Sequence, residues 1–125
     1  MKNQKFSLSQ RVKSFTYAFN GLKILLKEEH NARLHLLAAI IVMIVGVVLE
    51  VSTMEWIALV FAIGLVITTE ILNSSIENIA DFISPAKHEK IKKIKDLAAA
   101  GVLISAVTAL IVGLIIFLPK IEKLF

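Results

Sequence analysis

The sequence predicts an all-α integral membrane protein, in which one helix on the membrane surface precedes three helices that cross the bilayer. Two observations support this fold class. Hydrophobic residues make up 57% of the 125 residues and the mean hydropathy is +0.79, which is too apolar for an ordinary water-soluble domain. The apolar residues also fall into three runs separated by short polar segments. We therefore expect a single membrane domain over residues 1–125.

Residues 5–28 predict an amphipathic helix that lies in the membrane interface. Apolar side chains recur there at helical spacing, and basic residues occupy many of the remaining positions. The apolar set is Phe6, Leu8, Val12, Phe15, Phe19, Leu22 and Leu25. The alternative is a disordered basic tail, but the regular spacing of the aromatic residues argues against it. The segment lacks the features of a signal peptide, so the first span is expected to be retained.

Three membrane spans are expected, at about residues 34–50, 56–82 and 96–119. The polar segment from Glu50 to Glu55 separates the first two and predicts a tight hairpin. The second span continues as helix beyond its apolar part and ends at Ser84-Pro85, because the residue before a proline disfavours the helical conformation. The third apolar run is about as long as the ~20 residues that a bilayer crossing needs.

The basic residues predict the orientation of the chain. Seven of the fourteen Lys and Arg residues lie before residue 34, five lie within residues 87–95, and none lies between these groups. By the positive-inside rule, the N-terminal helix and the 82–96 loop face the cytoplasm. Lys120 and Lys123 on the opposite side are a mild contradiction. Since the basic residues flank apolar runs, the net charge of +4 favours anionic lipid headgroups over nucleic acid as partner.

The second span carries the main functional clue, a polar stripe near its cytoplasmic end. Glu70 and Glu77 are seven residues apart, which places them within about 20° of each other around a helix. Asn73, Ser74 and Asp81 fall on the same stripe. An ionisable side chain at the bilayer centre costs about 2.5–3.5 kcal/mol, so such residues usually face a protein interior, a cavity or a metal.

Several polar residues from different segments are expected at the same cytoplasmic boundary and could form one site. They are Glu29, Glu70, Asn73, Glu77, Lys95 and Asp96. Carboxylates and an amide are hard oxygen ligands that suit Mg²⁺ shared with the phosphates of a nucleoside triphosphate. A remaining carboxylate could remove a proton from a hydroxyl group while the metal and Lys95 stabilise the transferred phosphoryl group.

The same residues leave other classes of function open. The chain has no cysteine, which excludes thiolate chemistry, and neither of the familiar glycine-rich phosphate loops. Any kinase must therefore bind the nucleotide with side chains at the membrane interface. A small proton- or cation-coupled transporter fits Glu70 and Glu77 equally well. A third possibility is a membrane protein without enzymatic activity, whose polar stripe only drives oligomerisation.

A longer motif resembles that of a known family. The segment Glu70-Ile-Leu-Asn-Ser-Ser-Ile-Glu77-Asn-Ile-Ala-Asp81 is followed by Lys95-Asp96 at the start of an alanine-rich span. This pattern resembles the signature of the small bacterial integral-membrane diacylglycerol kinase and undecaprenol kinase family. The likeness covers almost the whole chain, because further segments keep the family's order and spacing: Gly21-Leu22, Glu29-x-x-x-Arg33, His88-Glu89 and Lys95-Asp96-x-x-x-Ala100.

The resemblance implies an ATP- and Mg²⁺-dependent lipid kinase of the bacterial inner membrane, assembled as a homotrimer whose sites form between neighbouring chains. By matching position, Glu70 is the implied base that accepts the proton of the lipid hydroxyl. Glu29 and Glu77 are the implied ligands of the Mg²⁺ that bridges the ATP phosphates. The other implied contacts are Tyr17, His88, Lys95 and Asp96 for ATP, and Asn73 and Ala99 for the acceptor lipid.

The acceptor lipid is expected to be undecaprenol, with diacylglycerol as the alternative. The diacylglycerol branch has a second acid six residues after the position of Glu29, whereas this chain has His35 there and resembles the Gram-positive undecaprenol kinase branch. Two departures from the family stand out. Arg11 does not align with the family's N-terminal Arg, and Ala99 replaces a serine of the diacylglycerol branch. We expected His35 to pack against a neighbouring helix or a lipid headgroup rather than to bind a metal.

Overall fold

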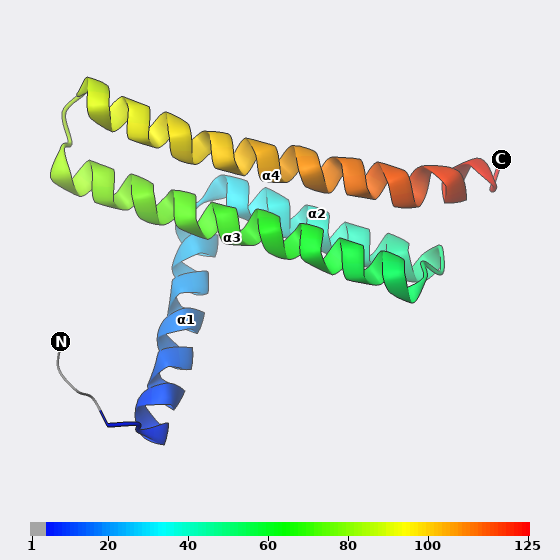
Figure 1. Cartoon of the computed structure of the whole chain (residues 1–125), viewed down its shortest axis with the longest axis horizontal. Coiled ribbons are helices and arrows are strands. Elements are labelled where there is room, and N and C mark those ends of the chain that lie inside the picture. The colour runs from blue at the N-terminus through cyan, green and yellow to red at the C-terminus, as the bar shows by residue number, and fades with distance from the viewer. Residues whose placement is uncertain (1–4) are drawn as a thin grey trace.

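The computed structural model describes residues 5–125, which form four α-helices: α1 (Leu8–Glu28), α2 (His30–Val48), α3 (Thr53–Ile83) and α4 (Glu89–Glu122). Figure 1 shows α2, α3 and α4 side by side as long rods, with α1 projecting crosswise from the start of α2. The central helix is α3, because it packs against each of the other three. The α2–α3 turn and the C-terminus lie at one end of the bundle, and the α3–α4 connection lies at the other (Figure 1). The all-α fold is confirmed.

Three of the helices are long and apolar enough to cross a membrane, in agreement with the three expected spans. Their bounds exceed the expected ones, most of all in α4, which begins at Glu89 rather than near residue 96. A helix of 34 residues is about 50 Å long, whereas the hydrocarbon core of a bilayer is about 30 Å thick. The polar first turns of α4 therefore extend beyond its apolar part.

The α1 helix begins three residues later than expected and ends at a break in the chain. Ser7 caps its first turn, with the Ser7 hydroxyl accepting a hydrogen bond from the Gln10 amide at 3.5 Å. Glu29 has extended backbone angles, φ −107° and ψ 110°, so it belongs to neither α1 nor α2. This single extended residue allows α1 to run crosswise to the bundle (Figure 1).

The turn between α2 and α3 is closed by local hydrogen bonds and by a close contact. Glu50 adopts a positive φ of 53°. Ser52 and Glu55 form a capping box, in which each side chain accepts a hydrogen bond from the other residue's amide, at 3.2 and 2.9 Å. Gly46 lies against the Trp56 indole so closely that a Cβ atom at this position would be 2.7 Å from the ring. An alanine at this position would therefore force the Trp56 ring to shift.

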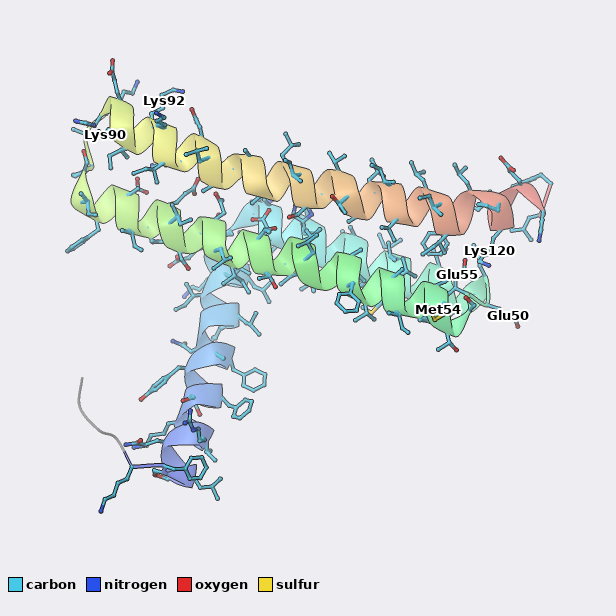
Figure 2. The ribbon with its side chains drawn as sticks, in the orientation of Figure 1. Glu50, Met54, Glu55, Lys90, Lys92 and Lys120 are labelled. Carbon is cyan, nitrogen blue, oxygen red and sulfur yellow. The ribbon has the colours of Figure 1, made fainter. Side chains whose placement is uncertain are left out.

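The same end of the bundle is braced by α4. Val51, Leu59 and Ile116 form a small buried cluster that joins the turn, α3 and α4. Lys120 near the end of α4 lies 3.0 Å from Glu55 at the start of α3, and Figure 2 shows both side chains at this end. Most large apolar side chains of the bundle are exposed, whereas Glu70, Ser74 and Ser105 are buried. This distribution suits a lipid environment, in which polar groups turn inward.

Candidate functional site

The centre of the candidate site is Glu70, whose residue surface is only 3% exposed. It projects from the middle of α3 toward α2, where the Nε2 atom of His35 lies 3.2 Å from its Oε1 atom. The ring and the carboxylate are close enough to form an ion pair, yet they are not aligned as a hydrogen bond, and Glu70 Oε1 has no hydrogen-bond partner among the described residues. Glu70 is therefore a buried carboxylate with one basic neighbour.

Glu29, at the junction of α1 and α2, is tied to the same face of α3. The Ser74 hydroxyl donates a hydrogen bond of 3.1 Å to Glu29 Oε1. Ser74 is itself buried, and its backbone carbonyl accepts a hydrogen bond of 2.8 Å from the Asn78 side chain. Two of the expected site residues, Glu29 and Glu70, thus come from different segments and lie on one face of α3.

Asn73 and Glu77 are half-buried residues farther along the same stripe of α3. The side-chain oxygen of Asn73 is buried without a hydrogen-bond partner in residues 5–125. No three His, Asp or Glu residues of that range are grouped closely enough to hold a metal ion by themselves. A metal ion at this face would therefore need ligands besides these residues, as Mg²⁺ has when it shares phosphate oxygens and water.

A second polar cavity, of about 500 Å³, lies around the α3–α4 connection and the first turns of α4. His88, Lys95 and Asp96 all line it. His88 caps α4, since its Nδ1 atom accepts a hydrogen bond of 3.1 Å from the Lys90 amide. Asp96 forms an ion pair of 2.7 Å with Lys92, and Lys95 forms an ion pair with Asp81. Figure 2 shows Lys90 and Lys92 at this end of the bundle.

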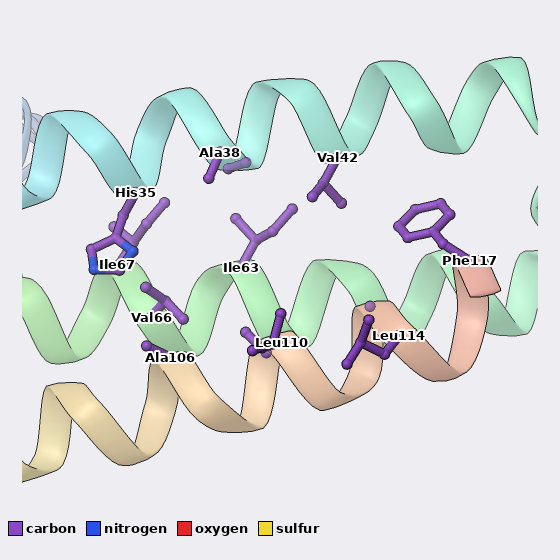
Figure 3. A pocket seen from close by; sticks show the side chains of 13 residues that line it. His35, Ala38, Val42, Ile63, Val66, Ile67, Ala106, Leu110, Leu114 and Phe117 are labelled. Atoms are coloured by element: carbon purple, nitrogen blue, oxygen red, sulfur yellow. The ribbon is translucent and has the colours of Figure 1, made fainter. Parts of the chain in front are cut away.

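An apolar groove of about 400 Å³ runs between α2 and α4 over the surface of α3. Figure 3 shows His35 at one end and Phe117 at the other, with Val42, Ile63 and Leu110 among the side chains between them. His35 is the one ionisable residue in this lining. The groove therefore leads along the membrane-spanning part of the bundle to the His35–Glu70 contact.

The expected site residues divide into two groups within one chain. The first group lies at one face of α3: Glu70 and Ser74 belong to this helix, and they contact His35 of α2 and Glu29 of the α1–α2 junction. Asn73 and Glu77 lie on the same stripe of α3. The second group, His88, Lys95 and Asp96, lines the second cavity. Two residues belong to neither group: Tyr17 on α1, which is 70% exposed, and Ala99 on the exposed surface of α4. The two groups adjoin at Lys95, which pairs with Asp81 of α3 and lies within electrostatic reach of Glu77.

Sequence reasoning missed the contact between His35 and Glu70. Both residues belong to stretches expected to cross the membrane, and an ionisable residue at such depth generally has a polar partner. That rule could have paired them, because both were expected on the cytoplasmic side of their spans. The packing of His35 against a neighbouring helix is confirmed, but its partner there is the buried carboxylate.

Comparisons with known proteins agree with the sequence motif. The family described as prokaryotic diacylglycerol kinase matches residues 16–117. The chain is 38% identical over 120 residues to the undecaprenol kinase of Bacillus subtilis, covering 96% of this chain and 98% of that protein. It is 30% identical over 111 residues to the diacylglycerol kinase of Escherichia coli K12, covering 89% of this chain and 91% of that protein. It is 33% identical over 95 residues to the diacylglycerol kinase of Helicobacter pylori 26695, covering 76% of this chain and 74% of that protein.

These relatives are lipid kinases, and the match extends over nearly all of the chain. Together with three helices able to cross a bilayer, the comparisons favour the kinase over the transporter and make this a multi-pass membrane protein. The chain belongs to the prokaryotic diacylglycerol kinase family of membrane lipid kinases.

Proposed function

We propose that the chain transfers the γ-phosphoryl group of ATP to the hydroxyl group of undecaprenol, giving undecaprenyl phosphate and ADP. The similarity to an undecaprenol kinase over almost the full length of both chains carries the choice of acceptor. Diacylglycerol, with phosphatidic acid as product, is the second candidate, because other relatives bear the name diacylglycerol kinase.

The base in this reaction is Glu70. Its burial beside an apolar groove suits a group that must meet a lipid hydroxyl, and its Oε1 atom has no hydrogen-bond partner in residues 5–125. In the proposed step Glu70 accepts the hydroxyl proton as the lipid oxygen forms a bond to the γ-phosphorus. The bond from that phosphorus to the β–γ bridging oxygen breaks, and ADP leaves. Asn73 and Ala99 are proposed to contact the acceptor.

Glu29 and Glu77 are proposed to hold Mg²⁺ together with the phosphate oxygens of ATP. Bound there, the ion would neutralise negative charge on the triphosphate. The hydrogen bond from Ser74 fixes the Glu29 carboxylate against α3. Because the described residues form no closed metal cage, we expect metal and nucleotide to bind together.

The nucleotide is proposed to contact Tyr17, His88, Lys95 and Asp96. Three of these, His88, Lys95 and Asp96, line the second cavity, in which Lys92 pairs with Asp96 and Lys95 pairs with Asp81. The chain is proposed to assemble as a homotrimer in which neighbouring chains complete each site, as the family resemblance implies. The N-terminal helix and the 82–96 loop are proposed to face the cytoplasm, where ATP is available.

The proposal is tested by a lipid phosphorylation assay. The full chain, purified in detergent and returned to vesicles, is given ATP and Mg²⁺ with either undecaprenol or diacylglycerol. Incorporation of phosphate into undecaprenol, at a higher kcat/KM than into diacylglycerol and abolished by Glu70→Gln, is the expected result. The reverse order of kcat/KM would assign diacylglycerol, and phosphorylation that survives Glu70→Gln would remove Glu70 as the base.

A further inference from the structure

We infer that His35 is a positioning residue for the reaction: the Nε2 atom of its ring holds the Glu70 carboxylate at the end of the apolar groove. This inference rests on the proposed function, because it assumes that Glu70 acts as the base. It adds a residue from α2 to a reaction whose other proposed groups lie on α3, on α4, in α1 or at the α1–α2 junction.

The geometry of the pair carries the inference. His35 Nε2 lies 3.2 Å from Glu70 Oε1, and the side chain of Glu70 is only 4% exposed, against 29% for that of His35. The contact is therefore enclosed around Glu70, and His35 is the more open of the two side chains. A carboxylate oxygen has two lone pairs, so Glu70 Oε1 can face the His35 Nε2 atom and still accept a proton from the acceptor.

The charges around Glu70 show why a basic neighbour is needed. The charged groups that act on it are Glu29 from the α1–α2 junction, Glu77 from α3 and His35 from α2, while α4 contributes only apolar residues to the adjoining groove. Two of these three groups are acids. His35 is thus the one basic group in this set, and it alone can attract the Glu70 carboxylate.

The position of His35 in the groove determines where the contact with Glu70 lies. His35 stands at the end of the groove opposite Phe117, and Figure 3 shows its ring among the apolar side chains of α2 and α3. His35 lines the groove together with Ile67 and Val66 of α3, and its Nε2 atom reaches the Glu70 carboxylate. An imidazole at this place keeps the Glu70 carboxylate at the His35 end of the groove.

The chemistry of the two ring nitrogens supplies a sharp test. A glutamine side-chain amide can place a nitrogen donor near the position of the histidine Nε2 atom, whereas the shorter asparagine places it near Nδ1. If Nε2 positions Glu70, His35→Gln should keep much of the function, and His35→Asn and His35→Ala should lose it. A role in packing alone would not favour glutamine in this way.

The experiment measures kcat and KM for ATP and for undecaprenol in vesicles, for the wild type and the three His35 variants. We expect His35→Gln to retain kcat within about threefold, and His35→Asn and His35→Ala to lose about 10- to 100-fold, the range that misplacement of a reacting group produces. KM for ATP should stay unchanged. The matched series His30→Gln, His30→Asn and His30→Ala, at an exposed histidine of the same helix, should show no such order.

Two results would overturn the inference while leaving the proposed function intact. In the first, the wild type is active and Glu70→Gln is inactive, but all three His35 variants keep the wild-type kcat. In the second, His35→Gln is as impaired as His35→Ala and all three variants melt at correspondingly lower temperatures, which would indicate a packing role. If the wild type phosphorylates neither undecaprenol nor diacylglycerol, the proposed function and the inference both fail.

Discussion

Ser74 on α3 donates a hydrogen bond to Glu29, the residue at which α1 ends and α2 begins, across 45 positions of sequence. This bond is a side-chain link between the α1–α2 junction and the polar stripe of α3. It fixes both the angle at which α1 leaves the bundle and the place of a proposed metal ligand. Structure and chemistry therefore depend on the same hydroxyl group.

Replacement of Ser74 by Ala should weaken the binding of Mg²⁺-ATP. Without the hydroxyl group, Glu29 loses its link to α3, and a loss of about 1 kcal/mol corresponds to about a fivefold rise in KM for ATP. Steady-state kinetics with ATP as the varied substrate measure this. Ser75→Ala is the matched control, because the Ser75 hydroxyl bonds only to the Ile71 carbonyl of its own helix. Equal KM values for the two variants would contradict the prediction.

Removal of a proposed metal ligand should raise the Mg²⁺ requirement. Glu29→Gln and Glu77→Gln each replace a charged oxygen ligand by a neutral amide, so we expect at least about a tenfold rise in the Mg²⁺ concentration for half-maximal activity. Titration of Mg²⁺ at fixed ATP measures this, and a chelator should abolish the activity of the wild type. Glu28→Gln, which changes the exposed acid next to Glu29, should leave the titration unchanged.

Subunit mixing tests whether chains share a site. Glu70→Gln should inactivate the group of residues on α3, and Lys95→Met should inactivate the second cavity. If neighbouring chains complete each site, mixed oligomers of the two inactive variants should regain activity, since some sites then receive both intact halves. Dissociation and reassembly in detergent, followed by the lipid phosphorylation assay, would show this. Mixtures that stay inactive, while wild-type chains survive the same treatment, would place each site within one chain.

A methyl group at Gly46 should destabilise the end of the bundle that carries the α2–α3 turn. The Cβ atom of Gly46→Ala would lie 2.7 Å from the Trp56 ring, and overpacking of this kind costs about 1–3 kcal/mol. Thermal unfolding in detergent measures the loss. Gly64→Ala is the control, because nothing lies within 4 Å of its Cβ position and alanine favours a helix. The double variant Gly46→Ala with Trp56→Leu should recover part of the stability, which a simple helix effect at position 46 would not explain.

The ion pair between Glu55 and Lys120 should contribute to stability in a way that salt weakens. Lys120→Gln removes only the pair, whereas Glu55→Gln also disturbs the capping box with Ser52, so Glu55→Gln should lower the melting temperature more. Melting curves at low and high ionic strength measure both effects. Lys123→Gln is the control, and a Lys120→Gln loss that does not shrink at high salt would contradict the prediction.

The sequence predicted the helices well because hydropathy and helical period determine them directly. The three apolar runs became α2, α3 and α4, and the stripe on α3 contains the buried Glu70 and Ser74. The start of α4 was placed too late, since the lysine-rich segment was assigned to a loop. In the structure His88 caps this segment, and the pair of Lys92 and Asp96 stabilises it as helix.

The arrangement of the site was less predictable, because it depends on how helices pack. The link between Ser74 and Glu29 and the contact between His35 and Glu70 join residues that are 45 and 35 positions apart, and no local pattern encodes such pairs. Tyr17 remains on an exposed face of α1, so its proposed role depends on what covers that helix.

Two contacts, Trp56 on Gly46 and Lys120 on Glu55, hold the end of the bundle at the α2–α3 turn. Two others, Ser74 with Glu29 and Lys95 with Asp81, hold the end that carries the polar stripe. A substitution at the turn can therefore alter stability alone, whereas a substitution in the stripe alters stability and the candidate site together.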